Sequence, residues 1–221
     1  MTAGVIHNFS VSRAHATQLR LAAKIVKKDK LPNKINSVAG VDVAYASGLA
    51  VGAVAVLDFA TLKLLEFQTA ICKVKMPYIP TLLAFRELPP AITCIRKLKR
   101  HPDVFFVDGH GIAHPYRCGF ASHLGLALGK PTIGVAKSQL IGKLVEIGDD
   151  VFLVDDNDQI IGSVVITKVG SQPLYVSVGH LVSLKTAVKI VKHCLRCHRI
   201  PEPLFLAHKI ASEQRCAVSK P

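Results

Sequence analysis

Apolar residues fall in short runs along the chain, and their spacing predicts β-strands in the first third of the sequence. Three such runs lie at residues 36–45, 50–58 and 63–74, and each is rich in Val, Ala, Leu or Ile. The breaks between these runs are the size of hairpin turns. Strands joined by turns this short pair antiparallel. We therefore expect an antiparallel meander in this region.

Amphipathic segments with helical spacing surround the meander. A basic helix is predicted over residues 11–29, ahead of Leu31-Pro32. A second helix should begin near Thr81. Pro89-Pro90 should end or kink it before a further helix to about Arg100, because proline lacks the N–H that a helix interior needs. Later helices are predicted near residues 118–129, 183–198 and 204–215.

Further apolar runs extend the sheet. Strands at 103–108 and 132–136 enclose the helix near 118–129, a unit that favours a parallel, right-handed crossover. Residues 151–154 and 160–169 predict another hairpin around an acidic turn, which lacks the glycine that a calcium loop would need. The chain has no repeat or linker. We expect one α/β domain over residues 1–221, with a mixed sheet of an antiparallel meander plus parallel strands, flanked by helices.

The charge of the chain indicates a polyanionic partner. Lys plus Arg number 28 against 15 Asp plus Glu, which gives a net charge of +13 and a pI near 9.6. Nucleic acid is the first candidate and an acidic membrane surface the second. No apolar stretch approaches the roughly 20 residues of a membrane span, and the N-terminus lacks the apolar segment of a signal peptide. We expect a cytoplasmic monomer without a membrane partner.

Two isolated aspartates stand out in the apolar strands. Asp42 lies among Val, Ala and Gly in the first strand, and Asp108 ends the strand at 103–108. A buried, ionised carboxylate costs several kcal/mol unless something compensates its charge. Two of them in a basic chain suggest a divalent cation held by carboxylate oxygens. That combination points to phosphodiester chemistry.

Three more residues are candidates for the same centre. Glu87 lies on the helix after Pro80 and could complete the acidic set, or pair with a cation at the surface. Lys137 follows the strand at 132–136, where it could stabilise charge on a phosphate or simply face solvent. His208, on the last helix, could carry a proton or serve a structural role.

The segment from Cys194 to His198 matches the C-x-x-C-H pattern of covalent haem attachment. Haem attachment requires export, which the N-terminus does not support. Zinc binding through Cys194, Cys197 and the adjacent histidines is sterically awkward in one helix, so a plain helix or a redox-sensitive pair is favoured. The histidines around Asp108, at positions 110, 114 and 123, are interpreted as loop or supporting residues.

Several segments, taken together and in order over roughly residues 36–210, closely resemble the endonuclease V family. They are Gly40-Val-Asp-Val-Ala-Tyr45, Pro77-Tyr-Ile-Pro80, Ala84-Phe-Arg-Glu87, Val107-Asp-Gly-His-Gly111, Ala113-His-Pro115, Pro131-Thr-Ile-Gly-Val-Ala-Lys-Ser138, Arg199-Ile-Pro-Glu-Pro203 and Ala207-His208. The resemblance implies a ribonuclease H-like fold and Mg²⁺-dependent cleavage, with Mn²⁺ as a substitute. The implied substrates are strands with deaminated bases, chiefly hypoxanthine (deoxyinosine) and then deoxyuridine, nicked at the second phosphodiester bond 3′ to the lesion.

The resemblance also assigns roles by position. It implies that Asp42, Asp108 and Glu87 hold the metal while Lys137 and His208 assist. The implied DNA-binding residues are Tyr78, which would fill the gap left by a flipped base, and its neighbours Pro77, Ile79 and Pro80, with Gly109 and Gly119 at the base edge. Two positions depart from the usual pattern: Thr81 stands where Gly is common, and Val178 replaces a Pro.

Two other functions remain open from the residues themselves. One is a ribonuclease H-type or junction-cleaving nuclease that uses the same acidic centre without reading a base. The other is a non-catalytic, basic nucleic-acid-binding module with structural carboxylates. Damaged DNA and inosine-containing RNA are both candidate partners, because recognition of a 2′-hydroxyl leaves no readable motif.

Overall fold

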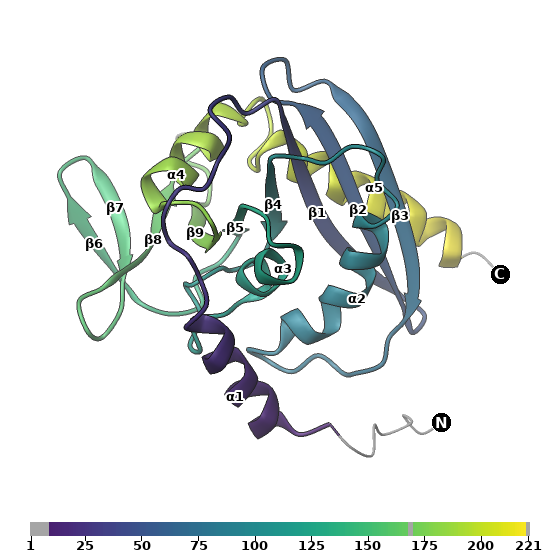
Figure 1. Cartoon of the computed structure of the whole chain (residues 1–221), viewed down its shortest axis with the longest axis horizontal. Coiled ribbons are helices and arrows are strands. Elements are labelled where there is room, and N and C mark those ends of the chain that lie inside the picture. The colour runs from purple at the N-terminus through teal and green to yellow at the C-terminus, as the bar shows by residue number, and fades with distance from the viewer. Residues whose placement is uncertain (1–8, 168–169, 220–221) are drawn as a thin grey trace.

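A mixed β-sheet lies at the centre of the computed structural model, which describes residues 9–167 and 170–219 (Figure 1). The described residues form nine strands in the order β3-β2-β1-β4-β5-β9-β8-β7-β6. The strands are β1 Ser37–Ala46, β2 Leu49–Asp58, β3 Leu64–Lys73, β4 Val104–Asp108, β5 Thr132–Ala136, β6 Lys143–Ile147, β7 Asp150–Val154, β8 Ile160–Val165 and β9 Leu174–His180. The helices are α1 Val11–Ala22, α2 Leu83–Ile95, α3 Phe120–Leu128, α4 Leu184–His193 and α5 Glu202–Ser219.

The predicted meander and crossover are confirmed. Strands β1, β2 and β3 pair antiparallel through their short turns. Strand β4 pairs parallel with β1 on the other side, and β5 pairs parallel with β4 after the crossover through α3. The carboxyl ends of β4 and β5 therefore lie at the same edge of the sheet, next to the second half of β1.

Helices cover both faces of the sheet. Helices α2 and α3 pack on the face that carries Val41 and Val107. Helices α4 and α5 pack on the opposite face, which carries Val38 and Phe106. Helix α5 comes very close to β1 because Gly40 has no side chain: a Cβ there would lie 1.9 Å from the carbonyl oxygen of Pro203. This close approach brings the first half of α5, which carries His208, against the second half of β1, which carries Asp42.

The predicted ends of three helices are wrong. Helix α1 ends at Ala22 rather than 29, and α4 ends at His193 rather than 198, so Cys194 caps the helix instead of lying inside it. Helix α5 begins at Glu202, two residues before the predicted start, and extends past 215. No helix in the described part of the chain is long and apolar enough to cross a membrane.

The prediction that Pro89-Pro90 ends the helix is also wrong, because α2 continues through both prolines to Ile95. The alternative that the prolines kink the helix stays a prediction. Leu88, Ala91 and Cys94 lie on either side of the prolines and pack against the same face of the sheet. Burial of these apolar side chains outweighs the backbone hydrogen bonds that the prolines remove.

Two strands were not predicted. Strand β6 is exposed along its whole length, and β9 lies in the interior of the sheet between β5 and β8. In the predicted hairpin, β7 and β8 do pair, although the last positions of the predicted run 160–169, residues 168–169, lie outside the described residues. The turn is ordered by Asp155, whose Oδ1 accepts hydrogen bonds from the N–H groups of Asn157 and Gln159.

Candidate active site

Asp42 and Asp108 meet at the carboxyl edge of the parallel strands. Val41 of β1 pairs with Val107 of β4, so the aspartates that follow them are neighbours across the two strands. Helix α5 adds His208, whose Nδ1 lies 2.8 Å from Oδ2 of Asp42. One ligand atom from each of Asp42, Asp108 and His208 lies within 4.8 Å of the others. This cluster could hold a metal ion.

The electrostatics of the cluster fit a divalent cation. Asp42 is 8% exposed. Burial raises the pKa of the Asp108 carboxyl, and the charge of Asp42 raises it further, whereas the Lys137 ammonium lowers it. The charge of Asp42 therefore makes Asp108 harder to ionise, a repulsion that a bound cation would relieve. The carboxylate oxygens of the cluster are ligands that suit Mg²⁺ or Mn²⁺.

Glu87 enters the same cleft from the opposite layer. It lies on α2, is 7% exposed, and its Oε1 accepts a hydrogen bond from the Tyr45 hydroxyl at 3.4 Å. Burial raises the pKa of the Glu87 carboxyl well above its usual value, and the charges of Asp42 and Asp108 add to this effect. Glu87 lies outside the 4.8 Å cluster, but with its members it lines an open cleft of about 480 Å³.

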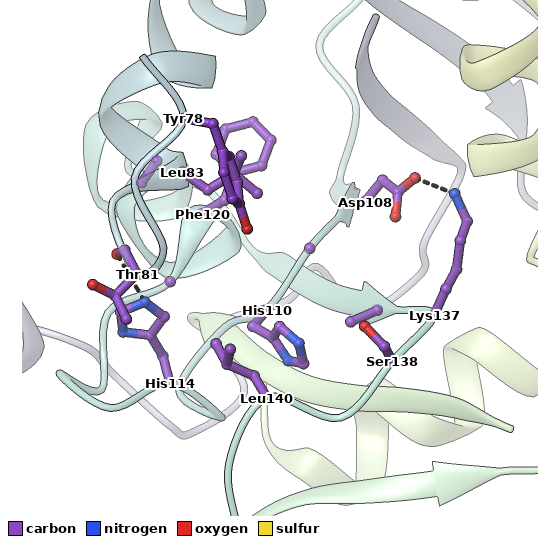
Figure 2. A pocket seen from close by; sticks show the side chains of 14 residues that line it. Tyr78, Thr81, Leu83, Asp108, His110, His114, Phe120, Lys137, Ser138 and Leu140 are labelled. Carbon is purple, nitrogen blue, oxygen red and sulfur yellow. Dashed lines mark hydrogen bonds and ion pairs between the residues drawn. The ribbon is translucent and has the colours of Figure 1, made fainter. Parts of the chain in front are cut away.

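Both the side chain and the backbone of Lys137 have partners that hold the residue beside the acidic cluster. Its Nζ lies 2.5 Å from Oδ2 of Asp108 (Figure 2). Its carbonyl oxygen accepts a hydrogen bond at 3.0 Å from Arg199, which also donates to the carbonyl oxygens of Gln172 and Pro173. The ammonium group is thereby fixed at the cleft, where it could contact a phosphate.

Three residues near the site received no role from the sequence. Arg199 supports Lys137, and Ser212 and Arg215 line the cleft. A signal for the last two was present. They follow His208 by four and seven residues on one helix, which places all three side chains on the same face. The three carbonyl groups that Arg199 contacts are distant in the sequence, so no local sequence pattern indicates these contacts.

A second cavity of about 280 Å³ adjoins the acidic cleft. Asp108 and Lys137 line both spaces, so the cavity opens directly beside the acidic cluster. Its remaining walls come from the segment between β3 and α2, the start of α2, the loop after β4, the start of α3, and the end of β5 with the segment that follows it (Figure 2). They comprise Tyr78, Thr81, Leu83, Ala84, Gly109, His110, His114, Gly119, Phe120, Ala136, Ser138 and Leu140.

The predicted base-contacting residues divide between the rim and the walls of this cavity. Tyr78 is 63% exposed at the rim, and its neighbours Pro77 and Pro80 are exposed without lining the cavity. Ile79 turns inward and packs with Met76 and Leu82. Gly109 and Gly119 line the cavity as expected.

The histidines of the cavity are neutral through burial, which lowers the pKa values of His110 and His114 to about 4. The tautomer of His114 follows from its partners. Its Nδ1 accepts from the N–H of Tyr116 at 3.2 Å, so its Nε2 carries the proton and donates to the carbonyl oxygen of Thr81 at 3.0 Å. These two histidines therefore add no charge to the cavity wall.

The C-x-x-C-H segment forms no metal site among the described residues. Cys194 is buried and Cys197 is exposed. His198 stacks on Phe205 with 3.3 Å between ring centroids, and its Nδ1 lies 3.0 Å from Oε2 of Glu202. These contacts support a structural role for the segment.

Comparison with known proteins identifies the family. The Endonuclease V family model matches residues 19–209. An Endonuclease V from Thermofilum pendens is 43% identical over 206 residues, which are 93% of this chain and 89% of that relative. The crystal structure of the Endonuclease V from Streptomyces avermitilis has a TM-score of 0.89 at 34% identity and covers 96% of both chains.

A protein–DNA complex is also among the similar structures. Ciona intestinalis Endonuclease V, in complex with a 24mer DNA containing an inosine followed by a ribo-adenosine, has a TM-score of 0.86 at 32% identity, covering 94% of this chain and 98% of that one. The expected ribonuclease H-like fold is confirmed by these structures. A non-catalytic binding module is excluded by the same matches. The chain belongs to the endonuclease V family and is an endonuclease.

Proposed function

We propose that this endonuclease nicks strands containing a deaminated base, chiefly hypoxanthine and also uracil, at the second phosphodiester bond 3′ to the lesion. One observation carries the proposal: a cavity whose histidines are neutral opens directly onto the acidic cleft and shares Asp108 and Lys137 with it. A base held in the cavity would keep its own strand close to the acidic cluster. A nuclease without base readout would need the cleft but not the cavity.

The metal is Mg²⁺ in this proposal, with Mn²⁺ as a substitute. Asp42, Asp108 and Glu87 would hold it, since all three carboxylates line the cleft and are buried enough to repel one another without a cation. When bound, the ion supplies Lewis-acid stabilisation of charge on the phosphodiester oxygens.

The side chains of the cleft have distinct tasks. The Lys137 ammonium would contact a phosphate oxygen, which adds fixed positive charge where negative charge develops. His208 is oriented by its hydrogen bond to Asp42 and would move a proton at the ring nitrogen that this bond leaves free. Arg199 would keep Lys137 in place through the carbonyl contact.

The cavity would receive the base after it leaves the stack. Extrusion costs a few kcal/mol and least for a mispaired base, which favours deaminated positions over intact pairs. Tyr78 at the rim would stack in the vacated space. Gly119 allows backbone groups to pack closely at the cavity wall, because a Cβ there would lie 2.4 Å from the carbonyl oxygen of His110.

A paired cleavage assay tests the proposal. A duplex with a single inosine is compared with its guanosine twin, each with Mg²⁺, with Mn²⁺ and with chelator. We expect a divalent-dependent nick only in the inosine strand, at the second phosphodiester bond on its 3′ side. Equal cleavage of both duplexes would favour the nuclease without base readout.

Replacing the nucleotide after inosine by a ribonucleotide then compares DNA with RNA as substrate. The Ciona intestinalis complex, whose DNA has a ribo-adenosine at that place, supports this choice of position. The net charge of +13 suits either polymer, so the ratio of the two rates assigns the substrate.

A further inference from the structure

Thr81 has a backbone conformation that is costly for its residue type. Its φ is +72°, in the left-handed region that β-branched residues rarely adopt. Such a conformation costs about 1–3 kcal/mol and persists only where the surroundings hold it. Thr81 ends the segment 77–81, here called the wedge segment, which carries Tyr78, and it also lines the cavity (Figure 2).

Three side chains hold Thr81 in place. The amide nitrogen of Gln18 donates to its carbonyl oxygen at 2.8 Å, and Nε2 of His114 donates to the same oxygen at 3.0 Å. Nε2 of His15 lies 2.9 Å from its hydroxyl oxygen. Two of the three, Gln18 and His15, come from α1, a helix that contributes no side chain to the cavity or the acidic cleft.

Gln18 also reaches a different part of the cavity wall. The same amide nitrogen donates to the carbonyl oxygen of Cys118 at 3.0 Å, directly before Gly119 at the start of α3. Gln18 is fully buried, and its Oε1 has no hydrogen-bond partner among the described residues. An unpaired buried amide oxygen costs about 1–3 kcal/mol, so the side chain is poorly suited to stability alone.

We propose that Gln18 is a positioning residue, which fixes the wedge segment at a set distance from the loop before α3. Its single amide group joins the carbonyl oxygens of Thr81 and Cys118, and so sets both the width of the cavity and the alignment of Tyr78 at its rim. Helix α1 is thereby part of the base-reading apparatus although it touches no base. This inference rests on the proposed function of the cavity.

The first test measures the wedge segment directly. The chain has no tryptophan, so Tyr78→Trp introduces a single indole at the rim. We expect Gln18→Leu in this background to increase the fast local motion of the indole, seen as a lower residual anisotropy in time-resolved fluorescence. The matched control is Leu19→Gly, an exposed neighbour on α1 whose replacement weakens the helix by about 1 kcal/mol. It should lower the melting temperature without changing the anisotropy.

The second test measures catalysis with Tyr78 intact. Gln18→Leu should lower kcat/KM on the inosine strand about 10- to 100-fold per folded molecule, as expected for small misplacements near a reacting group. Adding Thr81→Gly should recover several-fold of this loss, because glycine adopts a positive φ without strain and needs no clamp. Leu19→Gly should leave the rate per folded molecule unchanged.

The outcomes separate this inference from the proposed function. Unchanged anisotropy and unchanged kcat/KM in folded Gln18→Leu would overturn the inference. If Gln18→Leu does not fold, Gln18→Asn serves instead, since its side chain is one methylene shorter and cannot reach both carbonyl groups. If the wild type cleaves both duplexes equally, the proposed function fails, whereas the anisotropy still decides whether Gln18 orders the wedge segment.

Discussion

His208 and Asp42 are 166 residues apart in the sequence, yet Nδ1 of one lies 2.8 Å from Oδ2 of the other. The contact depends on Gly40, two residues before Asp42, where the missing side chain lets α5 approach β1. Asp108 adds a second carboxylate at the same edge, so the two aspartates lie together where a metal ion could bind, with the imidazole beside them.

Replacing Asp42 or Asp108 by Ala should therefore abolish divalent-dependent nicking. The expected loss is about 10²- to 10³-fold or more, as for removal of a group that stabilises charge in the transition state. In chelator, either variant should melt at the same temperature as the wild type or higher, because a repelling buried carboxylate is gone. Cleavage assays and thermal unfolding check both parts.

Metal titration provides the control for this prediction. Mg²⁺ or Mn²⁺ should raise the melting temperature of the wild type, since a ligand that binds only the folded state stabilises it. The same ions should have little effect on either variant. Near-normal nicking by both variants would show that the carboxylates do not hold the metal.

How far the site was predictable depends on the range of each interaction. The neighbouring positions of Asp42 and Asp108 follow from strand alternation and the parallel crossover, which are local rules. Strand β9 was not predicted from the sequence, because Gly179 and the buried Ser177 interrupt its apolar pattern. Ser177 is satisfied by the N–H of Gly111 at 2.8 Å, a long-range partner that no pattern along the chain reveals.

The two prolines predicted that Tyr78 is held out from the fold, and its side chain is 63% exposed. The contacts that support the wedge segment were not predicted. Gln18 looks like an ordinary polar position on an amphipathic helix. Its burial depends on two carbonyl groups 63 and 100 residues away. Likewise, Pro89-Pro90 follows a helix-ending rule that packing of the flanking apolar residues overrides. Local sequence rules therefore point to the candidate site residues, whereas tertiary contacts decide how the side chains of these residues are positioned.

The basic surface should make binding to undamaged duplex strongly salt-dependent. Each phosphate that Lys or Arg neutralises contributes about −0.9 to the slope of log K against log salt concentration. We expect a slope steeper than about −3, measured by fluorescence anisotropy of a labelled duplex. The inosine duplex should bind more tightly with the same slope, because the lesion adds no charge. A flat dependence would argue against an extended phosphate track.

Burial of His114 should make the protein less stable in mild acid. Its pKa is lowered from 6.5 to about 4 in the folded protein, so between these pH values the unfolded chain takes up a proton that the folded chain does not. The free energy of unfolding should therefore fall as pH drops from about 6.5 to about 4, by up to about 3 kcal/mol from this group. Denaturant titrations at several pH values, in chelator, measure the change.

The matched variant is His114→Gln, which retains an amide donor toward Thr81 but does not titrate. Its free energy of unfolding should fall less steeply over the same pH range. Because both proteins share all other titrating groups, the difference between the two curves isolates His114. Curves of equal steepness would show that the imidazole already takes up its proton in the folded state.

Tyr78 is expected to matter for cleavage far more than for stability. Its side chain is 63% exposed at the cavity rim, so truncation removes little buried surface and should change the free energy of unfolding by less than about 0.5 kcal/mol. Stacking of a base on an aromatic ring is worth about 1–3 kcal/mol. Tyr78→Ala should thus lower cleavage of an inosine duplex about 5- to 150-fold.

Tyr78→Phe separates the ring from the hydroxyl group. Stacking needs only the ring, so the Phe variant should cleave at close to the wild-type rate while the Ala variant does not. Pro77 and Pro80 restrict the backbone on either side, which leaves the ring little entropy to lose when it inserts. Rates per folded molecule and melting temperatures of both variants provide the comparison. If Tyr78→Ala lowers the melting temperature sharply and leaves the rate per folded molecule unchanged, the ring supports the fold and does not act as a wedge.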